Sequence, residues 1–374
     1  LFPYTTLFRS DYVNNEVVDS SIHVKMEASN NLSLFQKMAG FKPKFSEIAF
    51  DIEDISKYGN NSWIAVIHAD GNGLGQILQS HGKDLVQNKK FATFSKAIDD
   101  ATKNAVKNAF EVVVKHDYDA RIVTQPKMRY PIRPIVIGGD DLTVIIRADL
   151  AFEFTKVFLK SFEEVSASLF TSIGIKEFEQ GLTACAGIAF IKESYPLHYG
   201  LHLAEQLCVD AKNKVRIESS PGILADPKYG QMPKSALAFY KVQDSFVEDL
   251  KVLKERTLIT SYGLSYYYGP YLLEDADSIS TKLNVIKKEA DKNDKTKAVG
   301  KLRQIVSETY KDKNTALFMM QRMKEVNKDF YQELNLENEL QAIQQSAKPQ
   351  EKNTKSLLLD LITLHSLNYG NREN

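Results

Sequence analysis

A pair of adjacent carboxylates between two apolar runs constrains the fold of this chain more than any other feature. The runs cover 135–137 and 142–146, are rich in β-branched residues, and enclose the tetrapeptide GGDD at 138–141. Such runs around two glycines predict two strands joined by a tight hairpin. Two unit charges about 4 Å apart repel by about 4 kcal/mol at an effective dielectric constant of 20, and a turn needs at most one Asp. The pair therefore indicates a cation that offsets the repulsion.

The composition is that of an ordinary soluble globular protein with room for two domains. The chain has 374 residues, 43% of them hydrophobic and 26% charged, and its formal net charge is zero, so no global basic field points to nucleic acid or membranes. Its two cysteines, Cys185 and Cys208, lie in apolar segments. We interpret them as small core residues, which excludes a disulfide scaffold and fits a reducing cytoplasm. Because no apolar run reaches 18 residues, we expect no membrane span.

The sequence of the first ten residues does not match the residue patterns of the rest of the chain. The sequence begins with Leu1, and the segment LFPYTTLFRS resembles a translated sequencing adaptor. We therefore treat residues 1–10 as non-native and expect a truncation upstream. Residues 11–60 are polar, with one short helix expected at 32–38, and we interpret them as a linker and the remnant of an upstream element.

The segment 61–245 predicts an α+β domain with the element order βαββαβ, which is the ferredoxin-like arrangement of a palm domain. A buried strand at 62–69 leads through a glycine-rich turn into a helix that ends near 79. The further expected elements are a helix at 91–115, a loop at 121–134, the hairpin, a helix at 150–170 capped by Asp149, a strand at 182–191, a helix at 196–217 and a last strand at 236–242.

After about residue 246 the strand pattern ends, and 246–374 predicts a small all-α domain. We expect helices near 280–290, 295–311, 314–333 and 354–366. The aromatic-rich stretch Tyr262 to Tyr271 could stack bases, but an aromatic core between the two domains is the favoured interpretation.

The βαββαβ order places the end of the first strand beside the hairpin. Asp70, at that end, should therefore lie next to Asp140 and Asp141. Three carboxylates on adjacent strands form a site for hard divalent cations, and two such ions about 3.5–4 Å apart promote in-line phosphoryl displacement. Glycines after Asp70 would let the backbone and a helix N-terminus approach phosphate oxygens: Gly71, Gly73 and Gly75. This pattern is typical of a palm nucleotidyltransferase.

Three stretches carry a resemblance to a known family: HADGNGLG, IGGDDLTVIIR, and LTACAGIAFIKESYPLHYGLHLAEQLCVDAK. Residues 60–245 resemble the GGDD-type second palm of the CRISPR Cas10 family, Csm1 and Cmr2, which is related to the GGDEF cyclases. The tail resembles the helical domain that follows this palm. The resemblance implies synthesis of cyclic oligoadenylate, or a related cyclic nucleotide, from ATP with Mg²⁺ or Mn²⁺, in antiviral defence.

The resemblance also implies roles for individual residues. The metal ligands would be Asp70, Gly71, Asp140 and Asp141. Lys212 matches a lysine that contacts triphosphate, Lys214 could substitute for it, and a solvated lysine at the helix end is the alternative. The full set of nucleotide-binding candidates is Gly71, Asn72, Gly73, Gly75, Gly138, Gly139, Lys212 and Lys214.

Departures from the family pattern leave alternatives open. The GGDEF cyclases have Glu-Phe where this chain has Asp141-Leu142, which favours Cas10-like over diguanylate chemistry. An HD nuclease, a first palm and a zinc insert are not visible, so the chain is either truncated or a compact stand-alone polymerase. The acceptor nucleotide needs a second site, from another palm or a homodimer. A structural subunit of a type III CRISPR complex, with crRNA and target RNA as partners, is the first alternative, and a GTP-using diguanylate cyclase is the second.

Several histidines invite a catalytic interpretation that their context does not support. His198 and His202 share a helix face but lack the Glu of a zinc protease, so packing or surface roles are favoured. The dipeptide His116-Asp117 lacks the further ligands of an HD phosphohydrolase, and we expect it to mark a helix end. His68 points to the same side of its strand as Asp70 and lies either near the site or beneath it.

Overall fold

A computed structural model describes ten stretches of the chain: 10–13, 16–19, 32–59, 61–87, 89–172, 181–218, 233–243, 249–292, 297–346 and 354–368.

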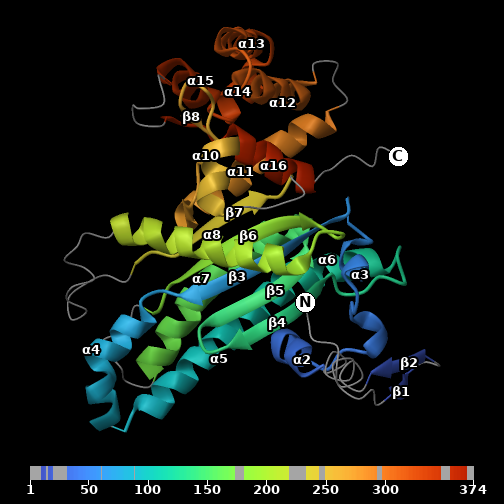
Figure 1. The fold of residues 1–374 in the computed structure, drawn as a ribbon, viewed down its shortest axis with the longest axis vertical. Helices are drawn as coiled ribbons and strands as arrows, with labels where there is room; N and C mark the ends of the chain where they lie inside the picture. The colour runs from blue at the N-terminus through green and yellow to red at the C-terminus, as the bar shows by residue number, and fades with distance from the viewer. Residues whose placement is uncertain are drawn as a thin grey trace.

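A six-stranded sheet in the order β4-β5-β3-β6-β7-β9 forms the centre of the protein (Figure 1). The strands β3 to β6 are antiparallel neighbours, and their order β4-β5-β3-β6 is that of a ferredoxin-like palm, as predicted. β7 adds parallel to β6, and β9 adds antiparallel to β7. The strands are β3 Trp63–Gly71, β4 Ile132–Gly138, β5 Asp141–Arg147, β6 Ala184–Lys192, β7 Ala236–Lys241 and β9 Tyr271–Leu272.

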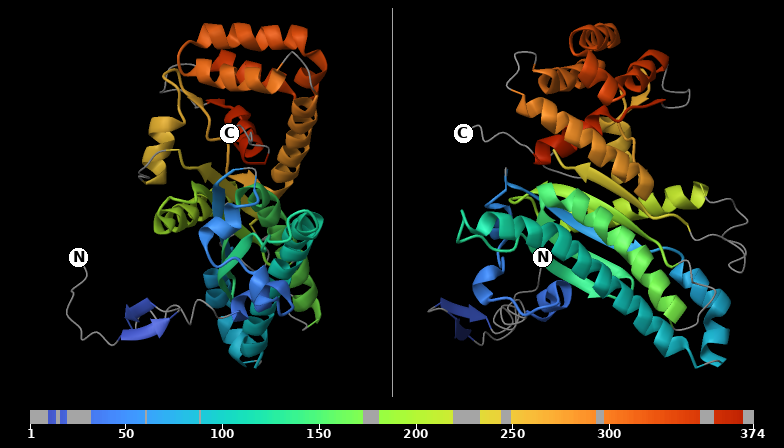
Figure 2. Two further views of the ribbon diagram at one scale, coloured as in Figure 1. Left: turned by 90° about the vertical axis from the view of Figure 1, so that its right-hand side faces the viewer. Right: turned by 180° about the vertical axis from the view of Figure 1, so that it is seen from behind.

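Helices cover both faces of the sheet because the side chains of each strand alternate between two apolar cores. Ala65, Ile67 and Ala69 face α5 Phe91–Ala109 and α7 Ala148–Ser172, whereas Ile64 and Val66 face α8 Leu197–Glu218. Figure 2 shows α5 and α7 side by side across one face and α8 across the other. The helix α4, Leu74–Gln87, follows the turn after β3.

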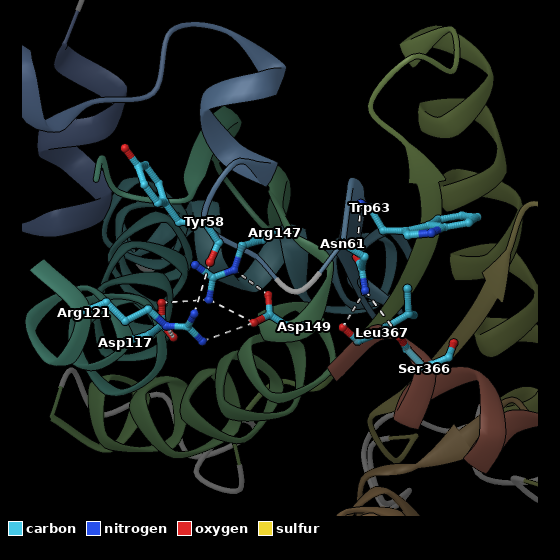
Figure 3. A network of polar contacts seen from close by, with 9 residues as sticks. All are labelled: Tyr58, Asn61, Trp63, Asp117, Arg121, Arg147, Asp149, Ser366 and Leu367. Atoms are coloured by element: carbon cyan, nitrogen blue, oxygen red, sulfur yellow. Dashed lines mark hydrogen bonds and ion pairs between the residues drawn. The ribbon is translucent and has the colours of Figure 1, made fainter. Parts of the chain in front are cut away.

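The expected helix end at His116-Asp117 is wrong. α5 continues through one π-helical turn, Phe110–Lys115, into α6, His116–Ile122. A polar pair can lie inside this helix because both carboxylate oxygens of Asp117 have arginine partners: Oδ1 accepts from Arg121 at 2.8 Å and Oδ2 from the buried Arg147 at 2.8 Å (Figure 3).

Arg147 is the centre of this ion network, at the end of β5 remote from the GGDD hairpin. It is 1% exposed, and its Nε also donates to Oδ1 of Asp149 at 2.6 Å (Figure 3). Asp149 therefore lies in the first turn of α7 as a partner of Arg147, and the expectation that it caps the helix is wrong. The network joins β5, α6 and α7, so removing one partner would leave a buried charge uncompensated.

The residues before β3 contribute to the palm core. α2 Ser33–Ala39 confirms the helix expected at 32–38, and its Phe35 and Met38 are buried among α5 and the sheet. A short 3₁₀ helix, Phe45–Glu47, and α3, Ile52–Ser56, follow. Farther upstream, β1 Ser10–Val13 pairs with β2 Glu16–Asp19.

A mostly helical region follows the palm, as predicted from the loss of the strand pattern. It lies beyond β7 and β9, at one edge of the sheet (Figure 2). Its helices are α10 Leu250–Thr257, α11 Leu273–Asp291, α12 Ala298–Thr309, α13 Lys313–Val326, α14 Lys328–Glu333, α15 Leu336–Gln345 and α16 Leu358–Asn368. A two-residue parallel pair, β8 Leu264–Ser265 and β10 Thr354–Lys355, lies within it.

The expectation that 236–242 is the last strand is wrong, because β9 joins the sheet beside it. Two residues are too few to leave a period-2 pattern in the sequence, which is why this strand is not visible there. β9 also carries the tyrosine cluster into the joint between palm and helices. Tyr271 stacks on Phe239 with ring centroids 5.7 Å apart, and Tyr266 is fully buried, which agrees with an aromatic core in this stretch.

Polar contacts reinforce the same joint. Asn61, just before β3, donates to the carbonyl oxygens of Ser366 and Leu367 in α16 at 3.3 and 3.1 Å (Figure 3). The Tyr271 hydroxyl donates to the half-buried Asp360 carboxyl, whose pKa desolvation raises to about 7. Within the described stretches, no helix is both long and apolar enough to cross a membrane.

We predict that Asp360 makes stability fall with rising pH. The pKa of Asp360 is about 7 in the folded protein against an ordinary 3.8, so the folded state binds the extra proton between those two pH values. The free energy of unfolding should therefore decrease between these two pKa values, by about 1.4 kcal/mol per pH unit. Above the folded-state pKa it should no longer change with pH on account of Asp360. Asp360→Asn keeps an oxygen that accepts from Tyr271 and cannot ionise, so it should lose this slope.

Urea unfolding of both proteins at about pH 5 and about pH 8 measures the slope. Asp329→Asn, at an exposed position on α14, is the control and should keep the wild-type slope. Equal slopes for wild type and Asp360→Asn would contradict the prediction.

Candidate functional site

Three carboxylates meet at one end of the palm sheet, as the element order predicted. In the antiparallel register of β3 and β5, Ala69 pairs with Leu142, so the next residues out are Asp70 and Asp141 at the same level. Asp140 occupies the turn of the β4–β5 hairpin. One carboxylate oxygen from each of Asp70, Asp140 and Asp141 lies within 4.8 Å of the others.

The hairpin has the short turn that the sequence indicated. Gly138 pairs with Asp141, so only Gly139 and Asp140 form the loop. Gly139 has φ of +59°, which suits a glycine at the first position of a two-residue turn of type II′. This geometry presents the carboxylates of Asp140 and Asp141 from consecutive residues.

Gly71 lets Asp140 approach the end of β3. A Cβ atom on Gly71 would lie 2.8 Å from Oδ2 and 2.9 Å from Cβ of Asp140, closer than real contacts allow. Close packing of the carboxylates therefore explains this glycine without reference to a ligand. The carbonyl oxygen of Gly71 also faces the site, where it accepts a hydrogen bond from Lys212 at 2.9 Å.

The remaining glycines fall into two groups. Gly73, with φ of +69°, and Gly139 occupy left-handed turn conformations, which explains why they are glycine. For Gly75, in the first turn of α4, and for Gly138, no atom of the described residues lies within 4 Å of where a Cβ would be, apart from chain neighbours and the helix's own backbone. The fold does not require glycine at Gly75 or Gly138, so these two leave backbone accessible to another molecule.

The electrostatics of the three carboxylates favour a bound cation. Burial first, and then the negative charges of Asp70 and Asp141, raise the pKa of Asp140. Burial and the charge of Asp70 likewise raise the pKa of Asp141, while His68 and Lys212 lower it. A divalent cation would relieve both the burial cost and the mutual repulsion, and carboxylate oxygens are the ligands that Mg²⁺ and Mn²⁺ prefer. The donor set therefore fits such an ion.

Lys212 reaches the carboxylates from α8. Its ammonium forms an ion pair with Asp70, and the side chain is 16% exposed. The alternative of a solvated lysine at a helix end is wrong, since Lys212 lies within α8 and faces the site. Gly187 permits this, because any Cβ there would lie 2.0 Å from the Ala204 carbonyl oxygen and hold α8 off the sheet.

Lys214 lies away from the carboxylates. Its ammonium donates to the carbonyl oxygen of Pro270 at 2.6 Å, near the start of the helical region. Two residues along a helix rotate a side chain by roughly 200°, which explains why Lys212 and Lys214 point in different directions. Of the two, Lys212 is the one that contacts the site.

Asn72 braces the turn after β3 from within. It is 3% exposed, and its side-chain amide donates to Oγ1 of Thr183 at 2.9 Å and to the Lys234 carbonyl oxygen at 3.4 Å. Its backbone amide donates to the Thr183 carbonyl oxygen at 2.8 Å. The side-chain amide and the backbone amide of Asn72 therefore both donate to other parts of the protein. Nucleotide binding by this side chain stays a prediction.

His68 lies near the site rather than beneath it. On β3 it faces the same side as Asp70, and its Nδ1 is 3.0 Å from Oγ1 of Thr143 on β5. By contrast, His202 is exposed on α8 and contacts Gln206, while the ring of His198 packs at a tilt against Tyr199. The two histidines of α8 have the surface and packing contacts that the sequence favoured.

Sequence reasoning missed the residues that hold the hairpin from outside the sheet. Thr102 and Asp99 of α5 both contact Gly139, and Lys37 of α2 contacts Ile137. A threonine or aspartate in a long amphipathic helix carries no motif, so only the packing of α5 on the hairpin reveals them.

Comparison with known proteins shows which family the residues around this site resemble. Residues 63–218 match the family model described as Cas10/Cmr2, second palm domain. A search of curated proteins finds no match.

Several solved structures with detectable similarity are assemblies named Csm1–Csm4 cassettes. One, in complex with cA4, shares 14% sequence identity with a TM-score of 0.41, and the match covers 85% of this chain and 38% of that chain. Another, in complex with cA3, shares 15% identity with a TM-score of 0.41 and covers 84% and 38%. A third, in complex with AMPPNP, shares 18% identity with a TM-score of 0.32 and covers 44% and 21%. The chain thus spans at most 38% of the length of these three chains.

The matched residues include all three carboxylates and Lys212. The resemblance that the motifs predicted is confirmed: residues 63–218 are a palm of the type found as the second palm domain in the Cas10/Cmr2 family.

Proposed function

We propose that this palm is a nucleotidyltransferase that makes cyclic oligoadenylate, or a related cyclic nucleotide, from ATP in type III CRISPR or related antiviral signalling. The observation that carries the proposal is the meeting of Asp70, Asp140 and Asp141 within a segment that matches the Cas10/Cmr2 second palm. Nucleotidyl transfer needs positioning and charge neutralisation more than a strong side-chain base, and this site offers both.

Each residue of the site would have a separate role in nucleotidyl transfer. Asp70, Asp140 and Asp141 would hold the divalent cations, with the Gly71 carbonyl beside them. When bound, such ions make a 3′-hydroxyl a better nucleophile and offset charge on the pyrophosphate that leaves the α-phosphate. Lys212 would exchange part of its contact with Asp70 for a charge-assisted hydrogen bond to a phosphate oxygen.

The acceptor nucleotide requires a second site. One palm binds one triphosphate at its carboxylates, so the other nucleotide must be held by another palm or by a second copy of this chain. We therefore expect activity to depend on assembly, whether in a homodimer or in a type III complex with crRNA and target RNA.

Mass spectrometry of the products formed from each NTP with Mg²⁺ or Mn²⁺ tests the proposal. Wild type should give a cyclic product from ATP, and Asp140→Ala/Asp141→Ala should give none, because the remaining carboxylate cannot hold the cations. Glu325→Ala/Asp329→Ala removes two exposed carboxylates of the helical region and should leave the product unchanged.

Each other result has a definite meaning. A product from GTP alone would replace the proposal with a diguanylate cyclase. If no NTP yields a product even with target RNA and complex subunits present, the palm has a structural role in the assembly and the proposed activity is wrong.

We predict that Lys212→Met weakens nucleotide use while the matched variant Lys214→Met does not. A charge-assisted hydrogen bond contributes about 1.5–3 kcal/mol, so Lys212→Met should raise KM for the triphosphate by about 10–100-fold. Lys214 lies on the same helix with its ammonium on the Pro270 carbonyl, so its loss should leave KM unchanged. Equal effects of both variants would contradict the role of Lys212.

We predict that alanine at Gly75 or Gly138 lowers nucleotide affinity without destabilising the fold. Neither added Cβ would lie within 4 Å of a described residue other than chain neighbours and the helix's own backbone. At Gly75, which is in α4, alanine is also about 1 kcal/mol more favourable than glycine. Thermal unfolding and equilibrium binding of a non-hydrolysable ATP analogue, measured on the same variants, separate the two effects. Unchanged affinity in both variants would show that these glycines do not mark a path of phosphate approach.

A further inference from the structure

The hairpin that carries Asp140 and Asp141 lies at an open edge of the sheet. β4 is the outermost strand on its side, so alternate carbonyl groups along its outer edge have no strand partner. One of these carbonyl groups, in Ile137, and the carbonyl group of the turn residue Gly139 receive side-chain donors from helices. Lys37 of α2 donates from Nζ to the Ile137 carbonyl oxygen at 2.5 Å, and Thr102 of α5 donates from Oγ1 to the Gly139 carbonyl oxygen at 2.6 Å.

Asp99 lies beside the same residue, Gly139. Its carboxylate faces the Gly139 backbone amide, one turn of α5 before Thr102. Asp99 is itself fixed by Lys103 and by Lys37, whose Nζ lies 3.6 Å from Oδ1. Although burial raises the pKa of Asp99, its contacts with Lys103, Lys37 and the Gly139 amide together lower it. The carboxylate is therefore an ionised acceptor at neutral pH.

Gly139 thus accepts a hydrogen bond from Thr102 at its carbonyl oxygen and has the Asp99 carboxylate beside its amide, and it directly precedes Asp140. Its φ of +59° sets the direction in which the chain enters Asp140, and a rotation of this residue would swing both hairpin carboxylates relative to Asp70. Metal ligands must be held within about 0.5 Å of their productive positions, and hydrogen bonds to the atoms behind them provide this restraint.

We propose that Thr102, Asp99 and Lys37 are positioning residues that fix the GGDD hairpin so that Asp140 and Asp141 meet Asp70 around a divalent cation. This inference rests on the proposed function, because that function assigns the three carboxylates to the cation. The first helix of the described palm core, α2, thereby acts on the site through Lys37, which lies on the far side of β4 from β5.

Thr102 differs from other buried threonines in where its hydroxyl points. A threonine inside a helix commonly donates to the carbonyl four residues earlier, as Thr155 of α7 does to Ala151 at 2.8 Å. Thr102 is equally buried, yet its hydroxyl reaches across to the hairpin. Pairing of β4 with β5 does not need this bond, because the ladder itself and the buried side chains of Ile137 and Leu142 hold the strands.

Mn²⁺ affinity measured by electron paramagnetic resonance tests the inference without any requirement for turnover. Thr102→Val removes the hydroxyl at nearly constant volume, and we expect Mn²⁺ to bind about 10–100-fold more weakly, the usual loss when a residue behind a metal ligand is replaced. Thr102→Ser retains a hydroxyl and should restore wild-type affinity. Thr155→Val makes the same chemical change at an equally buried helical site and should leave affinity unchanged.

Three results would overturn the inference. Wild-type affinity in Thr102→Val would show that the hydroxyl does not position the hairpin, and equal weakening by Thr102→Val and Thr155→Val would show a general loss of packing. Absence of Mn²⁺ binding by the wild type would overturn the proposed function together with this inference, and so is distinguishable from the first two. If Thr102→Val does not fold, Asp99→Ala removes the acceptor on the partly exposed side of the same residue. Unchanged Mn²⁺ affinity in Asp99→Ala would then overturn the inference.

Discussion

The antiparallel pairing of β3 with β5 is the constraint on which the site depends. Its register brings Asp70 level with Asp141, while the two-residue turn projects Asp140 over Gly71. A shift of one residue would send Asp70 to the other face of the sheet. The buried alternation of β3, with Ile64 and Val66 on one side and Ala65 and Ile67 on the other, makes such a shift costly because it would exchange the two sets between two differently shaped, closely packed cores.

The sequence was most informative where pattern and chemistry coincide. Alternating apolar runs located β3, the hairpin, β6 and the long helices, and the βαββαβ order alone was enough to bring Asp70 to Asp140 and Asp141. What could not be predicted depends on packing between distant segments. The direction of Lys212, the bracing of Asn72 by Thr183 and the contacts of Thr102 with Gly139 each join residues more than 30 positions apart.

The errors have the same physical origin. His116-Asp117 and Asp149 looked like helix ends because polar residues favour termini when no partner is in view. In the folded chain both aspartates are neutralised by Arg147, whose position at the end of β5 no local pattern connects to them (Figure 3). β9 was missed for a different reason, because a two-residue strand takes its stability from β7 and from the stacking of Tyr271 on Phe239 rather than from its own sequence.

Each carboxylate-bearing segment is held by a different part of the fold. Asn72 ties the turn after Asp70 to the segment before β6, α8 sets Lys212 against Asp70, and α5 with α2 grips the hairpin through Gly139 and Ile137. These contacts involve backbone atoms, the Asn72 side chain and a single positive charge near the carboxylates, that of Lys212. The three carboxylates are therefore brought together while their mutual repulsion stays only partly compensated. A site that is geometrically fixed and still short of positive charge binds a cation with little reorganisation, which is the condition for tight and selective metal binding.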